Sequence, residues 1–186
     1  MLTKYPIQNT SKSAYAKAFA LFFFATLLSK VGYNGAIMGT NISTLADLAI
    51  FAESEKERLV AGDKHAFLLT LSGELGAGKT AFTQALAKTF GVALPVTSPT
   101  FVLMNIYPLN TQKFERLVHI DAYRLHGGKE LAPIGFHDIY KNPKNLIVLE
   151  WPEQVHDALP LADRALTFTV SEERERYVQD TYGTEK

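Results

Sequence analysis

Residues Gly73 to Thr80 have the types and spacing of a phosphate-binding loop. Their sequence, GELGAGKT, fits the pattern G-x-x-x-x-G-K-[ST] without a mismatch. Small residues at positions 73, 76, 77 and 78 let the backbone approach phosphate oxygens, with its N–H groups directed at the anion. The Lys79 ammonium offers a positive charge for the β- and γ-phosphates, and the Thr80 hydroxyl can bind Mg²⁺. The loop therefore predicts a nucleoside-triphosphate site that takes ATP and Mg²⁺.

The residues on either side of the loop support this interpretation. Residues 65–71 are largely apolar, which predicts a buried strand before the loop. Residues 79–90 place apolar side chains at helical spacing after it, and Gly91 is suited to end that helix. The predicted nucleotide-contacting residues are the loop and the next position along the chain: Gly73, Glu74, Leu75, Gly76, Ala77, Gly78, Lys79, Thr80 and Ala81.

Two acidic residues are candidates to complete a magnesium site. Glu150 directly follows the uninterrupted apolar segment 145–149, and Asp121 is expected at the end of a half-apolar strand in the segment 117–124. Both segments are predicted strands, and open α/β sheets bind ligands at the carboxyl ends of their strands. An acid at a strand end is also commonly just solvated. The two acids are therefore informative because they accompany the loop.

Two further positions are suited to a nucleotide-dependent switch. A hydroxyl of Ser98-Pro99-Thr100 could contact the γ-phosphate, and a plain turn with Thr100 starting a strand is equally compatible with the pattern. Trp151 is the only tryptophan and follows Glu150. Packing in the core or in a lid is the simpler interpretation of Trp151, and a response to nucleotide is the alternative hypothesis.

The elements that must position these side chains alternate between strands and helices. A helix is predicted over 44–60, because Thr44 and Asp47 have the spacing of a capping box. The order of the elements predicts an α/β, three-layer P-loop NTPase fold, with a mostly parallel central sheet and helices on both faces. Further strands are predicted over 102–107, 117–124, 145–149 and 165–170, with a short helix within 129–139 and a charged, frayed tail.

Composition limits the class of protein. The 186 residues are 47% hydrophobic and 20% charged, as in a globular protein, and we place a single domain at residues 38–186. The absence of cysteine excludes disulfides, thiolate zinc sites and a cysteine nucleophile. Of the 19 basic residues, four lie in residues 1–37, which leaves 15 basic and 19 acidic residues in the rest. This acidic balance disfavours autonomous nucleic-acid binding.

Residues 1–37 form an N-terminal extension with some features of a signal sequence. Lysines precede the apolar segment 18–28, which is too short to span a bilayer as a helix. An enzyme that uses ATP and Mg²⁺ is expected in the cytoplasm, without a membrane partner. Three interpretations stay open: a translated stretch upstream of a true start at Met38, an extra helix packed on the domain, or a weak membrane anchor. We favour the first, because a recognisable domain begins soon after Met38.

Four motifs, in this order and at these intervals, resemble the bacterial TsaE (YjeE) family. They are GELGAGKT at 73–80, SPTF at 98–101, HIDAYRL at 119–125 and EWPE at 150–153. The resemblance covers about residues 45–170, and the combination is far more specific than the loop alone. Members of the family are small P-loop ATPases required for making threonylcarbamoyladenosine in tRNA. The resemblance therefore implies an ATPase that serves this modification.

The resemblance also implies roles for individual residues. Lys79 and Thr80 are expected to bind the nucleotide phosphates and Mg²⁺, with Glu150 as the second metal ligand. Asp121 and Glu150 are the acids needed for activity. The implied catalytic set is Lys79, Asp121, Glu150 and Thr100, and the switch-like residues are Ser98, Thr100 and Trp151.

The family resemblance implies partners as well. Members act with the TsaB–TsaD pair, in which TsaD transfers the threonylcarbamoyl group, and ATP hydrolysis is thought to drive or reset that complex. By this analogy the chain reaches tRNA indirectly, through the complex. Two positions depart from the family pattern: Ala81 stands where a second Thr is common, and Glu74 where Asp is usual. The missing hydroxyl at position 81 is expected to affect affinity more than hydrolysis.

Two other functions are compatible with the same loop. A small-molecule or nucleotide kinase is the alternative, but such enzymes usually carry an arginine-rich lid, and Arg116, Arg124 and Arg164 are scattered along the chain. A nucleotide-binding regulator without appreciable hydrolysis is the third possibility. The intact set of Lys79, Thr80 and the two acids weighs against it.

Overall fold

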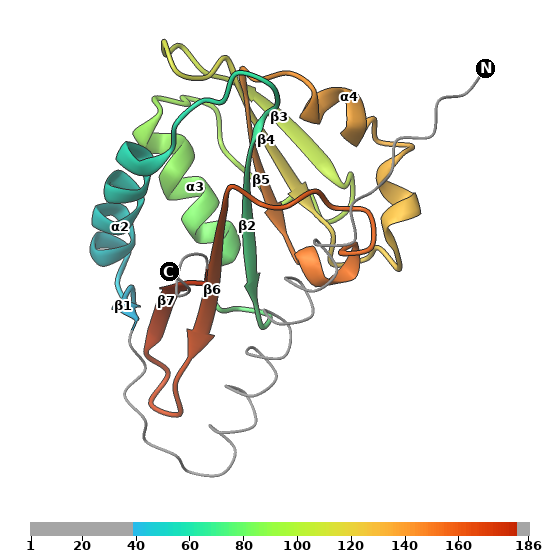
Figure 1. The fold of residues 1–186 in the computed structure, drawn as a ribbon. Helices are drawn as coiled ribbons and strands as arrows, with labels where there is room; N and C mark the ends of the chain where they lie inside the picture. Colours follow the sequence, from blue (N-terminus) through green and yellow to red (C-terminus); the bar gives the residue numbers. More distant parts are fainter. Residues whose placement is uncertain (1–38, 182–186) are drawn as a thin grey trace, which may run out of the picture. The chain divides into compact units, whose positions relative to one another are not determined.

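The computed structural model describes residues 39–181, so the N-terminal extension expected at residues 1–37 lies outside the described part of the chain. Within 39–181 the chain forms a seven-stranded sheet flanked by helices (Figure 1). Across the sheet the strand order is β1-β7-β6-β2-β5-β4-β3. The strands are β1 Thr40–Asn41, β2 Phe67–Gly73, β3 Met104–Pro108, β4 Arg116–Asp121, β5 Asn145–Glu150, β6 Arg164–Val170 and β7 Arg176–Asp180.

The sheet is mixed, which corrects the prediction of a mostly parallel sheet. The four central strands, β6, β2, β5 and β4, run parallel, whereas β3, β7 and β1 pair antiparallel to their neighbours. The length of the connections explains the difference. A parallel pair needs a crossover of about a dozen residues or more, and the segments 109–115 and 171–175 that join β3 to β4 and β6 to β7 are shorter. The predicted α/β class itself is confirmed.

Strand β7 also corrects the prediction of a frayed tail, as far as residues 176–180 are concerned. Its sequence, RYVQD, is mostly polar, and Val178 is its one buried residue. The strand forms because β6 offers an open edge, on which Phe168 pairs with Val178 and Thr169 with Tyr177. Strand β1 then pairs with the outer edge of β7. These pairings extend the sheet on the side of β2 opposite β5.

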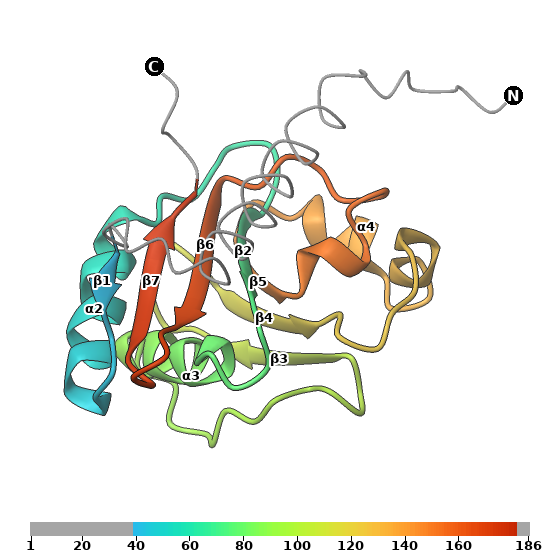
Figure 2. The same ribbon diagram turned by 90° about the horizontal axis from the view of Figure 1, so that it is seen from below.

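The two long helices lie on one face of the sheet, and the shorter helical segments lie on the other (Figures 1 and 2). Helix α2, Leu45–Arg58, packs against helix α3, Lys79–Thr89. On the opposite face, α4 packs against β5. The shorter segments are the 3₁₀ turns η1, Gly128–Leu131, and η2, Pro152–Gln154, and the helix α4, Phe136–Tyr140. No helix within 39–181 is long and apolar enough to cross a membrane.

Side chains of the central strands are buried on both faces of the sheet. Leu69 and Val148 belong to the hydrophobic core beneath α2 and α3. Leu68 and Ile147 are equally buried but lie outside that core. Successive side chains of a strand point to opposite faces, so a sheet covered on both faces needs continuous apolar strands. This explains why residues 145–149 show no polar alternation.

Helix α2 begins where the capping box predicts. Thr44 Oγ1 accepts a hydrogen bond from the Asp47 N–H at 3.1 Å, and Asp47 Oδ2 accepts one from the Thr44 N–H at 3.2 Å. Two N–H groups that the helix cannot satisfy internally thus gain partners. Phe51 of α2 then contacts Phe82 of α3, with ring centroids 5.5 Å apart.

Glu55 joins α2 to the strands through a buried ion pair with Arg164. Its fully buried carboxylate accepts hydrogen bonds from Arg164 Nε and, at 3.0 Å, from Arg164 Nη2. Arg58 Nη1 adds a bond to the same carboxylate at 3.1 Å. Arg164 Nη1 in turn lies 2.7 Å from Asp180 Oδ2. One arginine of β6 therefore connects α2 and β7.

Replacement of Glu55 by Ala is expected to lower the free energy of unfolding by about 3–5 kcal/mol, because Arg164 would keep a buried charge without its main partner. Urea denaturation of the full chain measures this change. The matched control is Glu53→Ala, which removes an exposed acid paired with Lys56 and should change stability by less than about 1 kcal/mol. Equal midpoints for both variants would contradict the role of Glu55.

Candidate functional site

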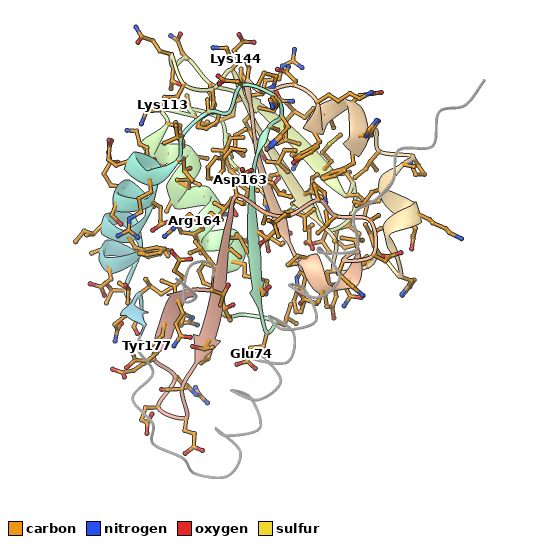
Figure 3. All side chains as sticks on the ribbon, in the orientation of Figure 1. Glu74, Lys113, Lys144, Asp163, Arg164 and Tyr177 are labelled. Carbon is orange, nitrogen blue, oxygen red and sulfur yellow. The ribbon has the colours of Figure 1, made fainter. Side chains whose placement is uncertain are left out.

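The phosphate-binding loop joins β2 to α3 at the carboxyl edge of the parallel strands. Figure 3 shows Glu74 at this edge and Lys144 at the opposite one. The loop requires glycine at its start, because Gly73 has a φ of 134° and a Cβ there would lie 2.3 Å from the carbonyl oxygen of Phe168. Gly78 is left-handed, and no side chain of the described residues caps α3. The first N–H groups of α3 are therefore available to an anion.

Lys79 is held inside this loop. Its side chain is buried, and Nζ donates hydrogen bonds to the carbonyl oxygens of Gly73 at 2.7 Å and Glu74 at 2.9 Å. Nζ also lies 3.8 Å from the ring centroid of Trp151, which is a cation–π contact. Burial lowers the pKa of Lys79, while surrounding carboxylates, above all Glu150, act in the opposite direction. The ammonium is thus fixed at the centre of the edge.

The carboxylate of Glu150 makes contacts with one residue of α3 and one residue of β4. Thr80 Oγ1 donates a hydrogen bond to Glu150 Oε2 at 3.0 Å, and His119 Nε2 lies 2.7 Å from Glu150 Oε1. A carboxylate only accepts, so His119 donates from Nε2, and its buried Nδ1 has no hydrogen-bond partner among residues 39–181. Both Glu150 and His119 are buried. The histidine therefore fixes the orientation of the carboxylate.

Thr80 and Glu150 carry donor atoms that suit Mg²⁺. Their oxygens lie 3.0 Å apart, and adjacent ligands of an octahedral Mg²⁺ with bonds of 2.0–2.1 Å are separated by about 2.9 Å. Within 39–181 no group of three or more His, Cys, Asp or Glu is placed to hold a metal. A magnesium ion at this position would therefore need phosphate and water oxygens as its remaining ligands.

Asp121 organises the segment that contains the predicted switch residues. Thr100 Oγ1 donates to Asp121 Oδ2 at 2.6 Å, and Ser98 Oγ donates to the same oxygen at 3.1 Å. The other oxygen, Oδ1, accepts from the N–H of Tyr123 at 3.0 Å. Asp121 is the cross-strand partner of Glu150 in the β4–β5 pairing. Thr100 lies in a turn, so it does not begin the next strand, which starts at Met104.

Trp151 has a backbone conformation that few non-glycine residues adopt. Its φ is 61° and its ψ is 51°, in the left-handed region, which costs about 1–3 kcal/mol. The backbone N–H of Trp151 donates to the Leu71 carbonyl at 3.0 Å. The ring centroids of Trp151 and Tyr123 are 4.9 Å apart. This reversal of the chain after β5 is what places the indole over Lys79.

Glu153 completes the acidic surroundings of Lys79. Pro152 begins η2, the short turn that follows Trp151 and contains Glu153. Desolvation raises the pKa of Glu153, and a backbone hydrogen bond, the charge of Lys79 and a hydrogen bond with Ser72 partly offset this rise. Glu153 Oε2 has no hydrogen-bond partner within the described residues. A half-buried acid with an unpaired oxygen therefore lies near the loop.

The structure brings the predicted site residues together at the carboxyl edge in two adjoining groups. In the first, Thr80 is hydrogen-bonded to Glu150 and the Lys79 ammonium lies over the ring of Trp151. The second joins Asp121 to the two hydroxyls of the switch-like segment, Ser98 and Thr100. Among the loop residues, Leu75 is 76% exposed. Ala81 is partly buried and packs against the hydrophobic core.

Sequence reasoning missed three residues of this edge: His119, Tyr123 and Glu153. All three lie within the two motifs HIDAYRL and EWPE. Residues 117–124 alternate between apolar and polar side chains, which puts His119 and Tyr123 on the same face as Asp121, and this pattern is a signal for both residues. The contact of His119 with Glu150 could not be inferred, because it depends on the register of β4 against β5.

Comparisons with known proteins agree on one family. The model of the family described as "Threonylcarbamoyl adenosine biosynthesis protein TsaE" matches residues 43–179. A protein of Streptomyces coelicolor named "tRNA threonylcarbamoyladenosine biosynthesis protein TsaE" is 43% identical over 122 residues, which cover 62% of this chain and 78% of that protein. A protein of the same name from Borreliella burgdorferi is 34% identical over 102 residues, which cover 55% and 71%.

A solved structure is similar in fold. The crystal structure of YdiB from Bacillus subtilis superposes with a TM-score of 0.57 and covers 75% of this chain and 81% of YdiB. The two sequences are 23% identical over the match. This likeness supports the arrangement of sheet and helices and carries no statement about activity.

Glu153→Gln is expected to remove a pH-dependent destabilisation. The pKa of Glu153 is higher in the folded protein than in the unfolded chain, so the unfolded chain loses the proton at lower pH. The free energy of unfolding therefore falls as the pH rises from the pKa of the unfolded chain through that of the folded protein. The variant should therefore melt above the wild type at pH 8, by about 2–4 °C for each kcal/mol relieved, and should match it near pH 4.

Thermal melting of both proteins across pH 4–8 checks this expectation. Glu172→Gln, which changes an exposed acid in the β6–β7 turn, is the control and should follow the wild type throughout. The same difference in melting temperature between wild type and Glu153→Gln at every pH would show that ionisation of Glu153 does not affect stability.

Proposed function

This chain belongs to the TsaE family, and on that premise we propose that it is a P-loop ATPase required for threonylcarbamoyladenosine modification of tRNA. The observation that carries the proposal is the hydrogen bond between Thr80 of the loop and the strand-end carboxylate of Glu150. It couples a phosphate-binding element to an acid suited to Mg²⁺, which is the pairing that P-loop hydrolases use.

Phosphate binding would use the loop backbone and Lys79. The N–H groups of residues 73–80 and of the first turn of α3 would point at the β- and γ-phosphates. Lys79 already has its ammonium against two loop carbonyls, so binding requires only that it exchange these acceptors for phosphate oxygens. Its burial strengthens the attraction, because water screens the charge poorly there.

Thr80 and Glu150 would hold Mg²⁺, and His119 would keep the Glu150 carboxylate in place. When bound, the ion would neutralise charge on the phosphate oxygens and orient them. Asp121 would position Thr100, because its Oδ2 accepts a hydrogen bond from Thr100 Oγ1 at 2.6 Å. Release of Thr100 from Asp121 would let the segment respond to the γ-phosphate, as switch segments do.

The cellular role comes from the family. Relatives from Streptomyces coelicolor and Haemophilus influenzae are named as tRNA threonylcarbamoyladenosine biosynthesis proteins, and we assign the same pathway to this chain. Its partners would be TsaB and TsaD, with ATP hydrolysis driving or resetting their complex in the cytoplasm. The active unit would be residues 38–186, with tRNA reached through the partners.

Lys79→Ala is expected to weaken ATP binding by about 100-fold or more, roughly 2.7 kcal/mol, because it removes the ammonium that is buried inside the loop. Isothermal titration calorimetry with Mg²⁺ and ATP measures the change. Lys88→Ala is the matched control, since Lys88 lies in the last turn of the same helix and is exposed. Equal affinities for both variants would show that nucleotide does not bind at the loop.

Glu150→Ala is expected to retain part of the nucleotide binding and to lose Mg²⁺-dependent hydrolysis by at least about 100-fold, because it removes the carboxylate beside Thr80. ATP turnover by the full chain, alone and with TsaB, TsaD and tRNA, is the measurement. Strong stimulation of the wild type by these partners would support the proposed role. Normal hydrolysis by Glu150→Ala in the complex would refute the metal assignment.

A further inference from the structure

Arg176 of β7 reaches the phosphate-binding loop from the side opposite the acids. Its Nε donates a long hydrogen bond, 3.4 Å, to the carbonyl oxygen of Gly76. Its Cδ lies 3.8 Å from the position that a Cβ on Gly78 would occupy. Arg176 is thus a side chain from a distant strand in contact with the centre of the loop. Tyr177, the next residue, lies at the same end of the molecule as Glu74 (Figure 3).

The backbone of Arg176 is fixed on both sides. Its N–H donates to Ser43 Oγ at 2.9 Å, and its carbonyl accepts from the Ile42 N–H at 2.8 Å. It also pairs with Val170 across the β6–β7 ladder. The start of β7 is therefore held between β6 and the segment that leads into α2. A side chain on such a rigid base suits a binding role.

Among the described residues, the guanidinium of Arg176 has no acidic partner. No carboxylate within residues 39–181 forms an ion pair with it, in contrast to Arg164, which binds Glu55 and Asp180. Its single described side-chain bond uses Nε, which leaves the two Nη groups and the flat face of the guanidinium for another group. The mechanism proposed above does not use this arginine.

The order of the strands indicates which part of a nucleotide would lie near Arg176. The acids that suit Mg²⁺ come from β5 and β4, on one side of β2, whereas Arg176 comes from β7, beyond β6 on the other. The metal binds the β- and γ-phosphates in P-loop sites. The nucleoside end must therefore leave the loop on the side away from Glu150, which is the side of Arg176.

From this geometry we propose that Arg176 binds the nucleoside portion of ATP, with its guanidinium stacked on the purine ring. The inference rests on the proposed function, since it presupposes a nucleotide in the loop. A planar guanidinium stacks well on aromatic faces, whereas the compact ammonium of lysine does not. The bond to Gly76 fixes one edge of the guanidinium plane and leaves its faces open. Arg176 thus supplies a stacking surface for the purine ring, and it lies outside the four sequence motifs.

The test compares ligands with and without a nucleoside. Isothermal titration calorimetry with Mg²⁺ gives the dissociation constants of ATP, ADP and inorganic tripolyphosphate for the full-length wild type, Arg176→Ala, Arg176→Lys and Arg116→Ala. Arg116 is the matched control, an exposed arginine at the amino end of β4, on the opposite edge of the sheet. Melting temperatures establish that all four proteins are folded.

The expected result is an approximately tenfold loss of ATP and ADP affinity in Arg176→Ala, with little recovery in Arg176→Lys. Tripolyphosphate binding should change by less than about twofold, and Arg116→Ala should match the wild type. Unchanged ATP affinity, an equal loss for ATP and tripolyphosphate, or full recovery in Arg176→Lys would overturn the proposal. A folded wild type that binds no ATP would instead refute the proposed function, so the two failures are distinguishable.

Discussion

The site depends on the carboxylate of Glu150, which connects three separate elements. One oxygen accepts from Thr80 of α3 and the other lies 2.7 Å from His119 of β4, while Glu150 itself ends β5. A buried carboxylate is costly unless its oxygens are hydrogen-bonded, so the two contacts fix the helix against the strands. They also hold the loop that precedes α3. The geometry around Lys79 follows from this arrangement.

The charges at the carboxyl edge of the sheet explain why phosphate binding there would need a metal ion. Lys79 is surrounded by the carboxylates of Glu150, Glu153, Asp121 and Glu74, in that order of influence on its pKa. One ammonium among four acids is a poor receptor for a polyphosphate, because the acids repel the phosphates in a partly desolvated site. A divalent cation between Glu150 and the phosphates would convert that repulsion into attraction.

The parallel part of the sheet and its antiparallel extension contribute different residues to the proposed site. The parallel strands β2, β5 and β4 bring the loop and the acids to one edge, as parallel strands must. The antiparallel extension by β7 and β1 adds Arg176 on the other side of the loop. The buried contacts of Glu55 with Arg164 hold that extension, through Asp180, against α2. The strands that these ion pairs stabilise are thus also the strands that bring Arg176 to the loop.

The sequence by itself determined the features that depend on consecutive residues. The loop at 73–80, the strand over 145–149 and the capping box at Thr44 were predictable, because each is built from neighbouring positions. Only the tertiary structure decided the contact of His119 with Glu150, across 31 positions, and that of Arg176 with Gly76, across 100. Strand β7 belongs to the same group, because its polar sequence becomes a strand only beside the open edge of β6. Such contacts depend on which distant segments of the chain pair with one another, and the residue pattern of a single segment does not contain that information.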